Sequence, residues 1–359
     1  MRIKIAEDFN EQPAVIKVIG VGGGGGNAVN RMVRSEFKTI EFITANTDAQ
    51  SLRHSLAGVK LQIGTKLTKG LGVGGDPVKG RQAAEESREA LTEALSGADM
   101  IFVTAGMGGG TGTGAAPVIG EIARSQGALT IAVVTKPFMF EGKLRNNQAE
   151  EGIKELRKCV DTLVIIPNQK LFSIIDEKTP AIKAFEVVDD VLRQAVGSIS
   201  NVITLHGFIN RDLVDVKTIM QNAGDALIGM GEGRGQDRAM QAVRAAISSP
   251  LLEDVTLDGA KGVLVNIIGT KEITMHEINQ AMSLIHQTVA SDARVFFGQA
   301  FDETLGDKIQ ITVIATGFPS VKKTTAKNTN SPDRFLQAEI EISDLDKPAY
   351  LRIKTRKIK

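Results

Sequence analysis

Tryptophan is absent from the 359 residues, tyrosine and cysteine occur once each, and histidine occurs four times. Aromatic residues make up only 4% of the chain, which argues against the base-stacking platforms that bind single-stranded nucleic acids. The lone cysteine, Cys159, excludes a disulfide framework within the chain and fits a reducing cytoplasm. Because the histidines show no ligand spacing, we expect no metal ion held by side chains alone.

An excess of charge of one sign is also missing. The chain has 43 basic and 42 acidic residues, and no long basic stripe precedes its last eight positions, so we expect no nucleic-acid partner. The start, "MRIKIAEDFNEQP", has no apolar stretch of signal-peptide type, which predicts a protein that is not exported. The longest uncharged run, residues 100–120, contains seven glycines and Pro117. We interpret it as strand, loop and helix start, and expect no direct insertion into a membrane.

Short β-branched runs alternate with helical patterns in the first half of the chain. The expected strands are 15–21, 40–48, 100–106, 129–137 and 161–168, and the expected helices are 27–35, 77–97 and 113–125. This alternation predicts an α/β fold with a mostly parallel, Rossmann-type sheet and helices on both of its faces.

The second half of the chain has a different pattern of predicted elements. Apolar residues recur at three- and four-residue steps over 180–204, which predicts one long, largely buried helix. Beyond it we expect helices over 216–230, 237–249 and 275–289 and strands over 261–269, 293–301 and 308–318, which form a smaller α+β domain. The expected organisation is an N-terminal tail (1–13), a nucleotide-binding domain (14–179), a central helix (180–204), an α+β domain (205–318), a disordered linker (319–342) and a C-terminal peptide (343–359).

Two glycine runs, each between a strand and a helix, dominate the first domain. The first, in "VIGVGGGGGNAVNRM", satisfies GxGxxG, and Asp48 follows the next strand as a candidate ribose ligand, so a nicotinamide-dependent oxidoreductase is one alternative. The second, in "MGGGTGTGAAPVIGEI", adds the hydroxyls of Thr111 and Thr113 at a helix start. Exposed peptide N–H groups and the positive ends of two helices favour bound phosphates.

A third glycine segment, residues 70–75, lies between these two runs, and three such segments suit a triphosphate better than a dinucleotide. No Walker A sequence occurs, so a P-loop NTPase is excluded. We therefore expect the backbone to hold the polyphosphate, with Mg²⁺ bound through the nucleotide in place of a P-loop lysine.

These motifs resemble those of the FtsZ family, the bacterial tubulin-like cell-division GTPases. The resemblance rests on "GGGTGTG", "VIGVGGGGGNAVNRM", "ANTDAQ", "KPFMFEGKLR", "IPN" and "ISSPLLED", in the family's order over residues 15–318, and on "DLDKPAYLR" in the tail. It implies a tubulin-like fold, GTP and GDP as ligands, and hydrolysis of GTP.

The resemblance also implies the residues of the nucleotide site. The residues that it assigns to the nucleotide are Gly23, Gly24, Gly25, Gly26, Asn27, Asn46, Gly74, Gly75, Gly108, Gly109, Gly110, Thr111, Gly112, Thr113, Glu141, Arg145 and Asn168, and helix geometry adds Phe185 and Asp189. Taken alone, Glu141 and Arg145 could equally form an exposed i,i+4 pair, and Asn168 could be a turn residue.

Phe185 and Asp189 lie four residues apart and therefore share one face of the long helix. A ring there can lie on a purine while the carboxylate accepts hydrogen bonds from the N1–H and 2-amino groups, which selects guanine. The alternative is a core phenylalanine beside a solvated aspartate. Asp190, one residue on, should point elsewhere.

The stretch "INRDLVDV" matches the family's acidic loop, and the resemblance makes Asn210, Asp212 and Asp215 the catalytic residues. Two carboxylates would repel a triphosphate in their own pocket, so we expect them to complete the site of the adjacent subunit in a head-to-tail filament. The alternative is a helix N-cap. The resemblance further implies a cytoplasmic protein at the midcell division site, with division-apparatus membrane adaptors bound by the C-terminal peptide. A nucleotide-regulated binding module without catalysis remains a further alternative.

Overall fold

The computed structural model describes residues 14–35, 37, 39–173, 175–176, 178–204, 213–252 and 257–318. These residues belong to one compact unit that ends at Pro319. The predicted N-terminal tail, linker and C-terminal peptide lie outside the described residues.

The elements of the first half are β1 (Ile16–Val21), α1 (Gly22–Arg34), β2 (Ile40–Asn46), α2 (Ala49–Arg53), β3 (Val59–Gln62), α3 (Thr65–Thr68), α4 (Pro77–Glu86), α5 (Arg88–Leu95), β4 (Met100–Gly106), α6 (Thr111–Ser125), β5 (Leu129–Lys136), η1 (Met139–Glu141), α7 (Lys143–Cys159), β6 (Thr162–Pro167) and η2 (Asn168–Ser173). Those of the second half are α8 (Ala181–Thr204), α9 (Leu213–Met220), β7 (Gly224–Gly233), α10 (Arg238–Ile247), η3 (Pro250–Leu252), η4 (Leu257–Gly259), β8 (Gly262–Gly269), α11 (Met275–Thr288), β9 (Arg294–Phe301), η5 (Glu303–Leu305) and β10 (Ile309–Thr316).

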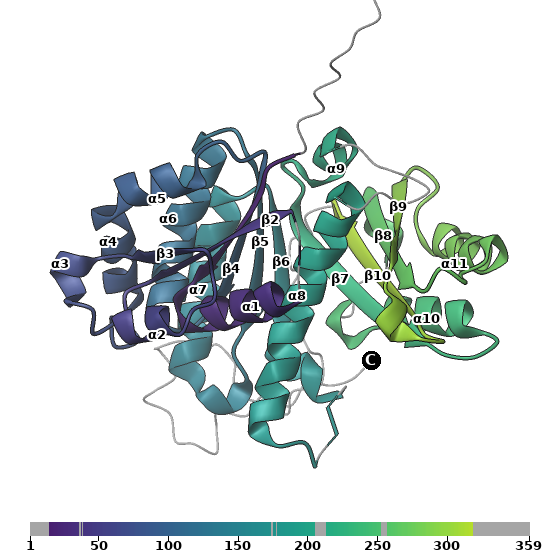
Figure 1. Cartoon of the computed structure of the whole chain (residues 1–359), viewed down its shortest axis with the longest axis horizontal. Helices are drawn as coiled ribbons and strands as arrows, with labels where there is room; N and C mark the ends of the chain where they lie inside the picture. The colour runs from purple at the N-terminus through teal and green to yellow at the C-terminus, as the bar shows by residue number, and fades with distance from the viewer. Residues whose placement is uncertain are drawn as a thin grey trace, which may run out of the picture. The chain divides into compact units, whose positions relative to one another are not determined.

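The strands form one sheet in the order β3-β2-β1-β4-β5-β6-β7-β10-β8-β9 (Figure 1). Neighbours from β3 to β6 are parallel, as their near-continuous apolar sequences require. β6 also pairs in parallel with the start of β7, whereas β10 runs antiparallel to both β7 and β8. The predicted fold class, a mostly parallel α/β sheet joined to a smaller α+β part, is confirmed.

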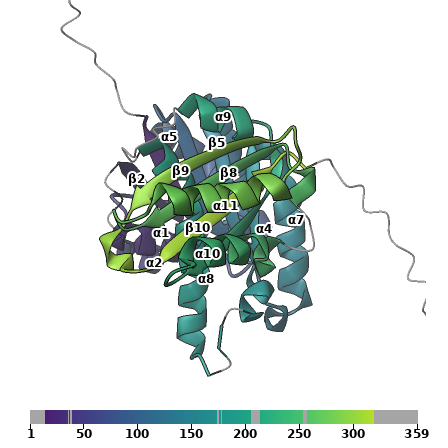
Figure 2. The ribbon, with the colours of Figure 1, turned by 90° about the vertical axis from the view of Figure 1, so that its right-hand side faces the viewer.

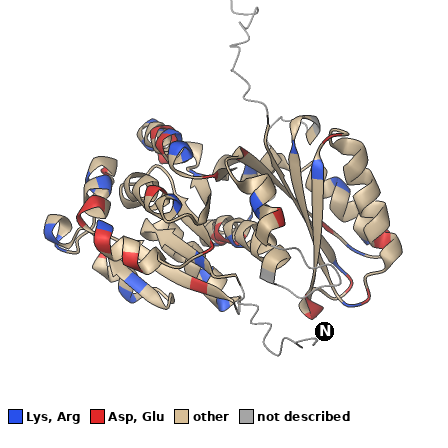
Figure 3. Cartoon of the chain, turned by 90° about the horizontal axis from the view of Figure 1, so that it is seen from above, with Lys and Arg blue, Asp and Glu red and all other residues tan. Residues whose placement is uncertain are grey.

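Separate apolar clusters cover the two faces of the parallel sheet. Helices α1 and α8 contribute to one cluster, which extends to Leu264 and Ile314 of the second half. Helices α4 to α7 contribute to the other. In the second half, α10 and α11 pack on the sheet and lie in front of it in Figure 2. Basic and acidic residues are interspersed along the helices (Figure 3).

The long helix predicted over 180–204 is present as α8, which packs against α1 and β5 on one side and β8 and β9 on the other. Its buried face carries Val188, Leu192, Ala195 and Ile199, at the helical spacing seen in the sequence.

The helix predicted over 216–230 is wrong in its second half, where the chain forms β7. Gly229, Gly231 and Gly233 alternate along this strand, and a Cβ at any of them would overlap a backbone carbonyl oxygen of α10. These glycines let helix and strand backbones approach closely, a packing that the helical pattern of the apolar residues concealed.

Most of the first glycine run is helical and not a loop as predicted, because α1 begins at Gly22 and not after the run. A Cβ at Gly25 would overlap the carbonyl oxygen of Thr104, and one at Gly20 would overlap that of Gly25. Part of the run therefore serves to seat α1 on β1 and β4.

Candidate nucleotide site

A cavity of about 600 Å³ opens at the carboxyl ends of β1, β4, β5 and β6, where ligands bind in open parallel sheets. Its lining includes all but three of the nucleotide-binding residues expected from the sequence. These are Gly23, Gly24, Asn27, Asn46, Gly74, Gly75, Gly108, Gly109, Gly110, Thr111, Gly112, Glu141, Arg145, Asn168, Phe185 and Asp189. Segments far apart in the sequence thus meet at one edge of the sheet.

Glycine backbone forms one end of this cavity. A Cβ at Gly23, Gly74, Gly75 or Gly109 would meet no atom within 4 Å, so these residues border open space. Gly74 and Gly75 have φ of 59° and 82°, a conformation that favours glycine. The first residues of α1 and α6 lie beside them, and the N-terminus of each helix carries about half a positive charge. This end suits an anion with several oxygens.

The remaining three expected residues do not line the cavity. Gly25 packs against Thr104, and Gly26 borders a smaller neighbouring cavity of about 200 Å³. The Thr113 hydroxyl accepts a hydrogen bond from the Gly108 N–H at 2.8 Å, so it shapes the loop.

Three expected side chains line the opposite end. Asn168 is 6% exposed, and its Oδ1 has no hydrogen-bond partner within the described part of the chain. Phe185 is 46% exposed, and its ring meets the buried ring of Phe138 edge-on at 5.6 Å. An unpaired buried acceptor is costly unless a donor reaches it, and the half-exposed ring offers an apolar surface to the cavity.

Asp189 completes this end of the cavity. Burial raises the pKa of its carboxyl group to about 6, although Arg31 lowers it, and Glu186 and Asp190 raise it further. The Asp189 carboxyl group is therefore partly desolvated before any ligand arrives.

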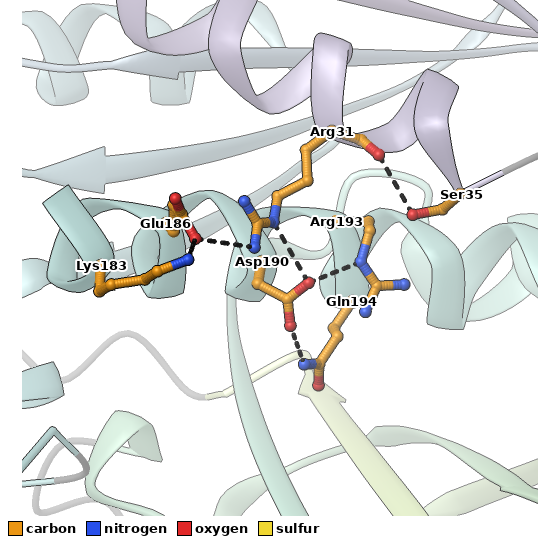
Figure 4. Close-up of polar contacts among 7 residues, drawn as sticks. All are labelled: Arg31, Ser35, Lys183, Glu186, Asp190, Arg193 and Gln194. Atoms are coloured by element: carbon orange, nitrogen blue, oxygen red, sulfur yellow. Dashed lines mark hydrogen bonds and ion pairs between the residues drawn. The ribbon is translucent and has the colours of Figure 1, made fainter. Parts of the chain in front are cut away.

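Asp190 is held away from the cavity by other groups (Figure 4). Its carboxylate accepts hydrogen bonds from Arg193 at 2.7 Å and from Gln194 at 2.6 Å, and it lies 3.6 Å from the Arg31 guanidinium of α1. Two adjacent aspartates on α8 thus have different surroundings, one facing the cavity and one bridging α8 to α1.

Glu141 and Arg145 line the cavity and also form an ion pair at 2.5 Å. Glu141 Oε1 accepts a hydrogen bond from the Phe138 N–H at 2.9 Å, which fixes the carboxylate at the start of η1. The i,i+4 pair that the sequence offered as an alternative is present, with the Arg145 side chain 54% exposed and that of Glu141 only 15% exposed, and a nucleotide-binding role of the two residues stays a prediction.

The sequence missed several polar residues of the wall, among them Thr47, Ser51 and Thr135. The Thr47 and Thr111 hydroxyls are hydrogen-bonded at 2.7 Å, which ties the loop after β2 to the start of α6. Asp48, the candidate ribose ligand, caps α2 by accepting from the Gln50 N–H and the Ser51 hydroxyl, both at 2.8 Å. The sequence "TDAQS" carries the signal for this N-cap.

The acidic residues lie elsewhere. Asn210 and Asp212 fall outside the described residues. Asp215 is on α9, whose last carbonyl oxygen, that of Met220, accepts a hydrogen bond from the hydroxyl of Thr162 at the start of β6. Asn168 follows the end of the same strand. The C-terminal end of α9 and the cavity therefore lie at opposite ends of the parallel strands.

Metal-binding side chains do not cluster in the described part of the chain, where no group of three or more His, Cys, Asp or Glu residues could hold an ion. In the cavity, both oxygens of Asp48 already accept hydrogen bonds. This donor set fits a cation carried by phosphate oxygens better than one held by the protein. None of the described helices has both the length and the apolar character of a membrane span.

The parallel sheet, the glycine-lined cavity and the long helix that carries Phe185 and Asp189 define a tubulin-like nucleotide-binding protein. The GTPase domain of the Tubulin/FtsZ family matches residues 15–176, and the C-terminal domain of the FtsZ family matches residues 224–319. A solved structure of an empty FtsZ dimer from M. jannaschii is 43% identical, with a TM-score of 0.83 over 86% of this chain and 89% of that one. The chain belongs to the FtsZ family.

Two further structures agree in fold. A mutant FtsZ from M. jannaschii is also 43% identical, with a TM-score of 0.82 over 85% of this chain and 92% of that one. A GTPgS-bound protofilament of CetZ2 from Haloferax volcanii is 20% identical, with a TM-score of 0.71 over 87% of this chain and 95% of that one. The second likeness concerns the fold alone.

Proposed function

We propose that this protein binds GTP, hydrolyses it to GDP and phosphate, and polymerises head to tail into the filaments of a cell-division ring. The observation that carries the proposal is the cavity itself, with open glycine backbone at one end and Asn168, Phe185 and Asp189 at the other. The first end suits the phosphates and the second suits the base. Membership of a GTPase family supports the choice of nucleotide over the dinucleotide of an oxidoreductase.

Guanine is selected by the polar groups at the second end. Asp189 accepts hydrogen bonds from the N1–H and 2-amino groups, while the ring of Phe185 covers the base. The unpartnered Asn168 Oδ1 gains a partner from the nucleotide. Adenine lacks the donors that Asp189 requires, and a site that leaves polar groups unpaired discriminates strongly.

Hydrolysis is completed in trans. The part of α8 from Asp189 to its last residue, Thr204, rises about 22 Å, and the end of α9, the helix that carries Asp215, is hydrogen-bonded to the start of β6, while the cavity lies at the carboxyl end of that strand. Asp215 cannot reach the cavity of its own chain across that distance. A head-to-tail contact would bring it, with Asn210 and Asp212, to the nucleotide of the next subunit, and an empty FtsZ dimer among the related structures supports self-association.

In this site Asp212 and Asp215 orient the attacking water, because bond formation to the nucleophile is slight in the loose transition state of phosphoryl transfer. The glycine N–H groups and the two helix N-termini stabilise the phosphate charge. Mg²⁺ bound through the nucleotide would supply additional positive charge. Assembly then triggers hydrolysis, since water-orienting acids and nucleotide meet only at an interface.

The rest of the chain has roles consistent with this function. Residues 14–179 form the GTP-binding domain, 180–204 the connecting helix and 205–318 the domain that presents the acids. The linker (319–342) and the peptide (343–359) reach membrane adaptors of the division apparatus, and the protein acts in the cytoplasm at midcell.

The test compares wild type with Asp215→Ala and Asp212→Ala. Both variants should bind GTP normally and assemble on addition of GTP and Mg²⁺, as seen by light scattering, but release phosphate at least tenfold more slowly. Wild-type phosphate release per molecule should rise with protein concentration. Release that is independent of concentration, or normal hydrolysis by both variants, would contradict completion in trans. No phosphate release at all would leave a non-catalytic binding module, and retention of NAD in preference to GTP would indicate an oxidoreductase.

A further inference from the structure

Helix α6 connects the nucleotide cavity with the opposite edge of the sheet. It begins at Thr111, directly after the cavity glycine Gly110, and has 15 residues, so it is about 22 Å long. Arg124 lies in its last turn. One helix therefore has its first residue at the phosphate end of the cavity and its last turn near the start of β6.

Arg124 makes three contacts at that edge. Its Nη2 donates to Oδ1 of Asn222, its Nη1 donates to the carbonyl oxygen of Lys158 at 3.3 Å, and its Nε lies 3.6 Å from Oδ1 of Asp161. The Asp161 side chain is only 6% exposed and also accepts from the Thr130 N–H at 3.0 Å and the Asn222 N–H at 3.4 Å. A planar guanidinium with several donors is suited to join such acceptors in a fixed geometry.

Asn222 lies in the turn between α9 and β7, with φ of 53°. Two threonine hydroxyls hold the end of α9 just before this turn, one from Thr162 to the Met220 carbonyl oxygen and one from Thr316 to the Ile219 carbonyl oxygen at 2.9 Å. The two threonines and Arg124, acting on Asn222, therefore hold the carboxyl end of α9 and its turn together.

We infer that Arg124 is a positioning residue for GTP hydrolysis, which acts through Asn222 to hold α9 and Asp215 in the orientation that reaches the adjacent subunit. This inference rests on the proposed function of Asp215. Arg124 does not touch the nucleotide and contributes only geometry.

The surroundings of Arg124 separate this role from a structural one. Its side chain is 41% exposed, and the buried Asp161 carboxylate keeps its hydrogen bonds from the Thr130 and Asn222 N–H groups when Arg124 is removed. A misplacement of about 1 Å in a catalytic group can, by contrast, lower a rate by up to about 100-fold. Loss of Arg124 should therefore affect turnover more than folding.

The test uses Arg124→Met and Asn222→Gly in the full chain. Glycine retains the left-handed backbone at position 222 without strain and removes only the side-chain bond. Each variant should lower kcat about five- to tenfold, with GTP affinity of the monomer, KM and Tm nearly unchanged. Arg124→Lys, which keeps one charged donor, should recover part of the rate. Lys154→Met, at an exposed cation of α7, is the matched control and should hydrolyse GTP as wild type does.

The double variant Arg124→Met/Asn222→Gly should be no slower than either single variant, because both remove the same bond. Asp215→Ala provides the reference. If Asp215→Ala hydrolyses GTP normally, the proposed function fails. If Asp215→Ala is slow while Arg124→Met and Asn222→Gly are normal, the inference about Arg124 is overturned, and a matching loss of GTP affinity in both variants would overturn it as well.

Discussion

Glycine gathers in two places in this molecule and does different work in each. Around the nucleotide cavity, Gly23, Gly74, Gly75 and Gly109 border open space. On β7, Gly229, Gly231 and Gly233 pack directly against the backbone of α10, which leaves no room for a side chain. The first group leaves its backbone open to the cavity, and the second lets two elements of the protein approach each other.

A glycine-rich sequence is therefore not by itself evidence of a ligand. What distinguishes the two groups is the space into which a side chain would project. Gly110 combines both features, because it lines the cavity and also packs against the loop that carries Gly74 and Gly75.

The largest expected effect tests the packed group. Gly231→Val would overlap the carbonyl oxygen of Ala242 and place a Cβ 2.8 Å from that of Ala245, so α10 must move away from β7. We expect a loss of about 3 kcal/mol in the free energy of unfolding, measured by denaturant titration, with GTP affinity of the folded protein unchanged. Gly58→Val, where a Cβ meets nothing closer than 4.0 Å, is the control. Reduced GTP affinity in folded Gly231→Val would remove the distinction between the two groups.

Gly110→Val should have the next largest effect. A side chain there would overlap Val73 and approach the Asp76 backbone nitrogen at 2.8 Å, which drives apart two loops of the cavity. We expect GTP affinity, measured by filter binding, to fall about 100-fold, since the phosphate donors lose their shared geometry. Thr111→Ala, which removes only the hydroxyl bonded to Thr47, should weaken binding severalfold. Normal binding by Gly110→Val would mean that the phosphates lie elsewhere.

The smallest expected effect is the pH dependence of GTP affinity that Asp189 causes. In the free protein the carboxyl of Asp189 has a pKa of about 6, and only the ionised form accepts both guanine donors. GTP affinity should therefore fall as pH drops through 6, by about fourfold between pH 7.5 and 5.5, because apparent affinity scales with the competent fraction.

Asp189→Asn supplies the comparison for that measurement. Its amide oxygen still accepts one hydrogen bond but does not titrate, so this variant should lack the Asp189 part of the pH dependence, while ionisation of the nucleotide phosphates affects both proteins equally. Identical pH profiles would show that Asp189 does not contact the base.

The sequence predicted the parallel strands well because β-branched runs such as "IKVIGV" and "LTIAVVT" are buried on both faces. It also predicted which glycine segments meet, since parallel strands end at one edge. It missed the short strand β3, none of whose four residues is fully buried, and it mistook β7 for a helix. Local periodicity cannot report that α10 packs on a glycine stripe.

The site shows the same limit. Asn168 and Asp189 came from resemblance and helical spacing, and the structure brings both to one cavity. The Thr47–Thr111 and Arg124–Asn222 bonds join residues 64 and 98 positions apart. Neither is visible in one sequence, because each depends on how separate elements meet in space.

The placement of the cavity and of α9 at opposite edges of the sheet makes each subunit directional. In a filament built as proposed, a completed site exists at each contact and nowhere else. A dimer would then contain one completed site for two nucleotides, and the terminal subunit with an uncovered cavity would retain GTP that no neighbour can hydrolyse. GTP turnover per subunit would rise with filament length towards a limit, so short filaments would hydrolyse their GTP more slowly per subunit than long ones. The two ends would also differ, because only one of them has an uncovered cavity that retains GTP.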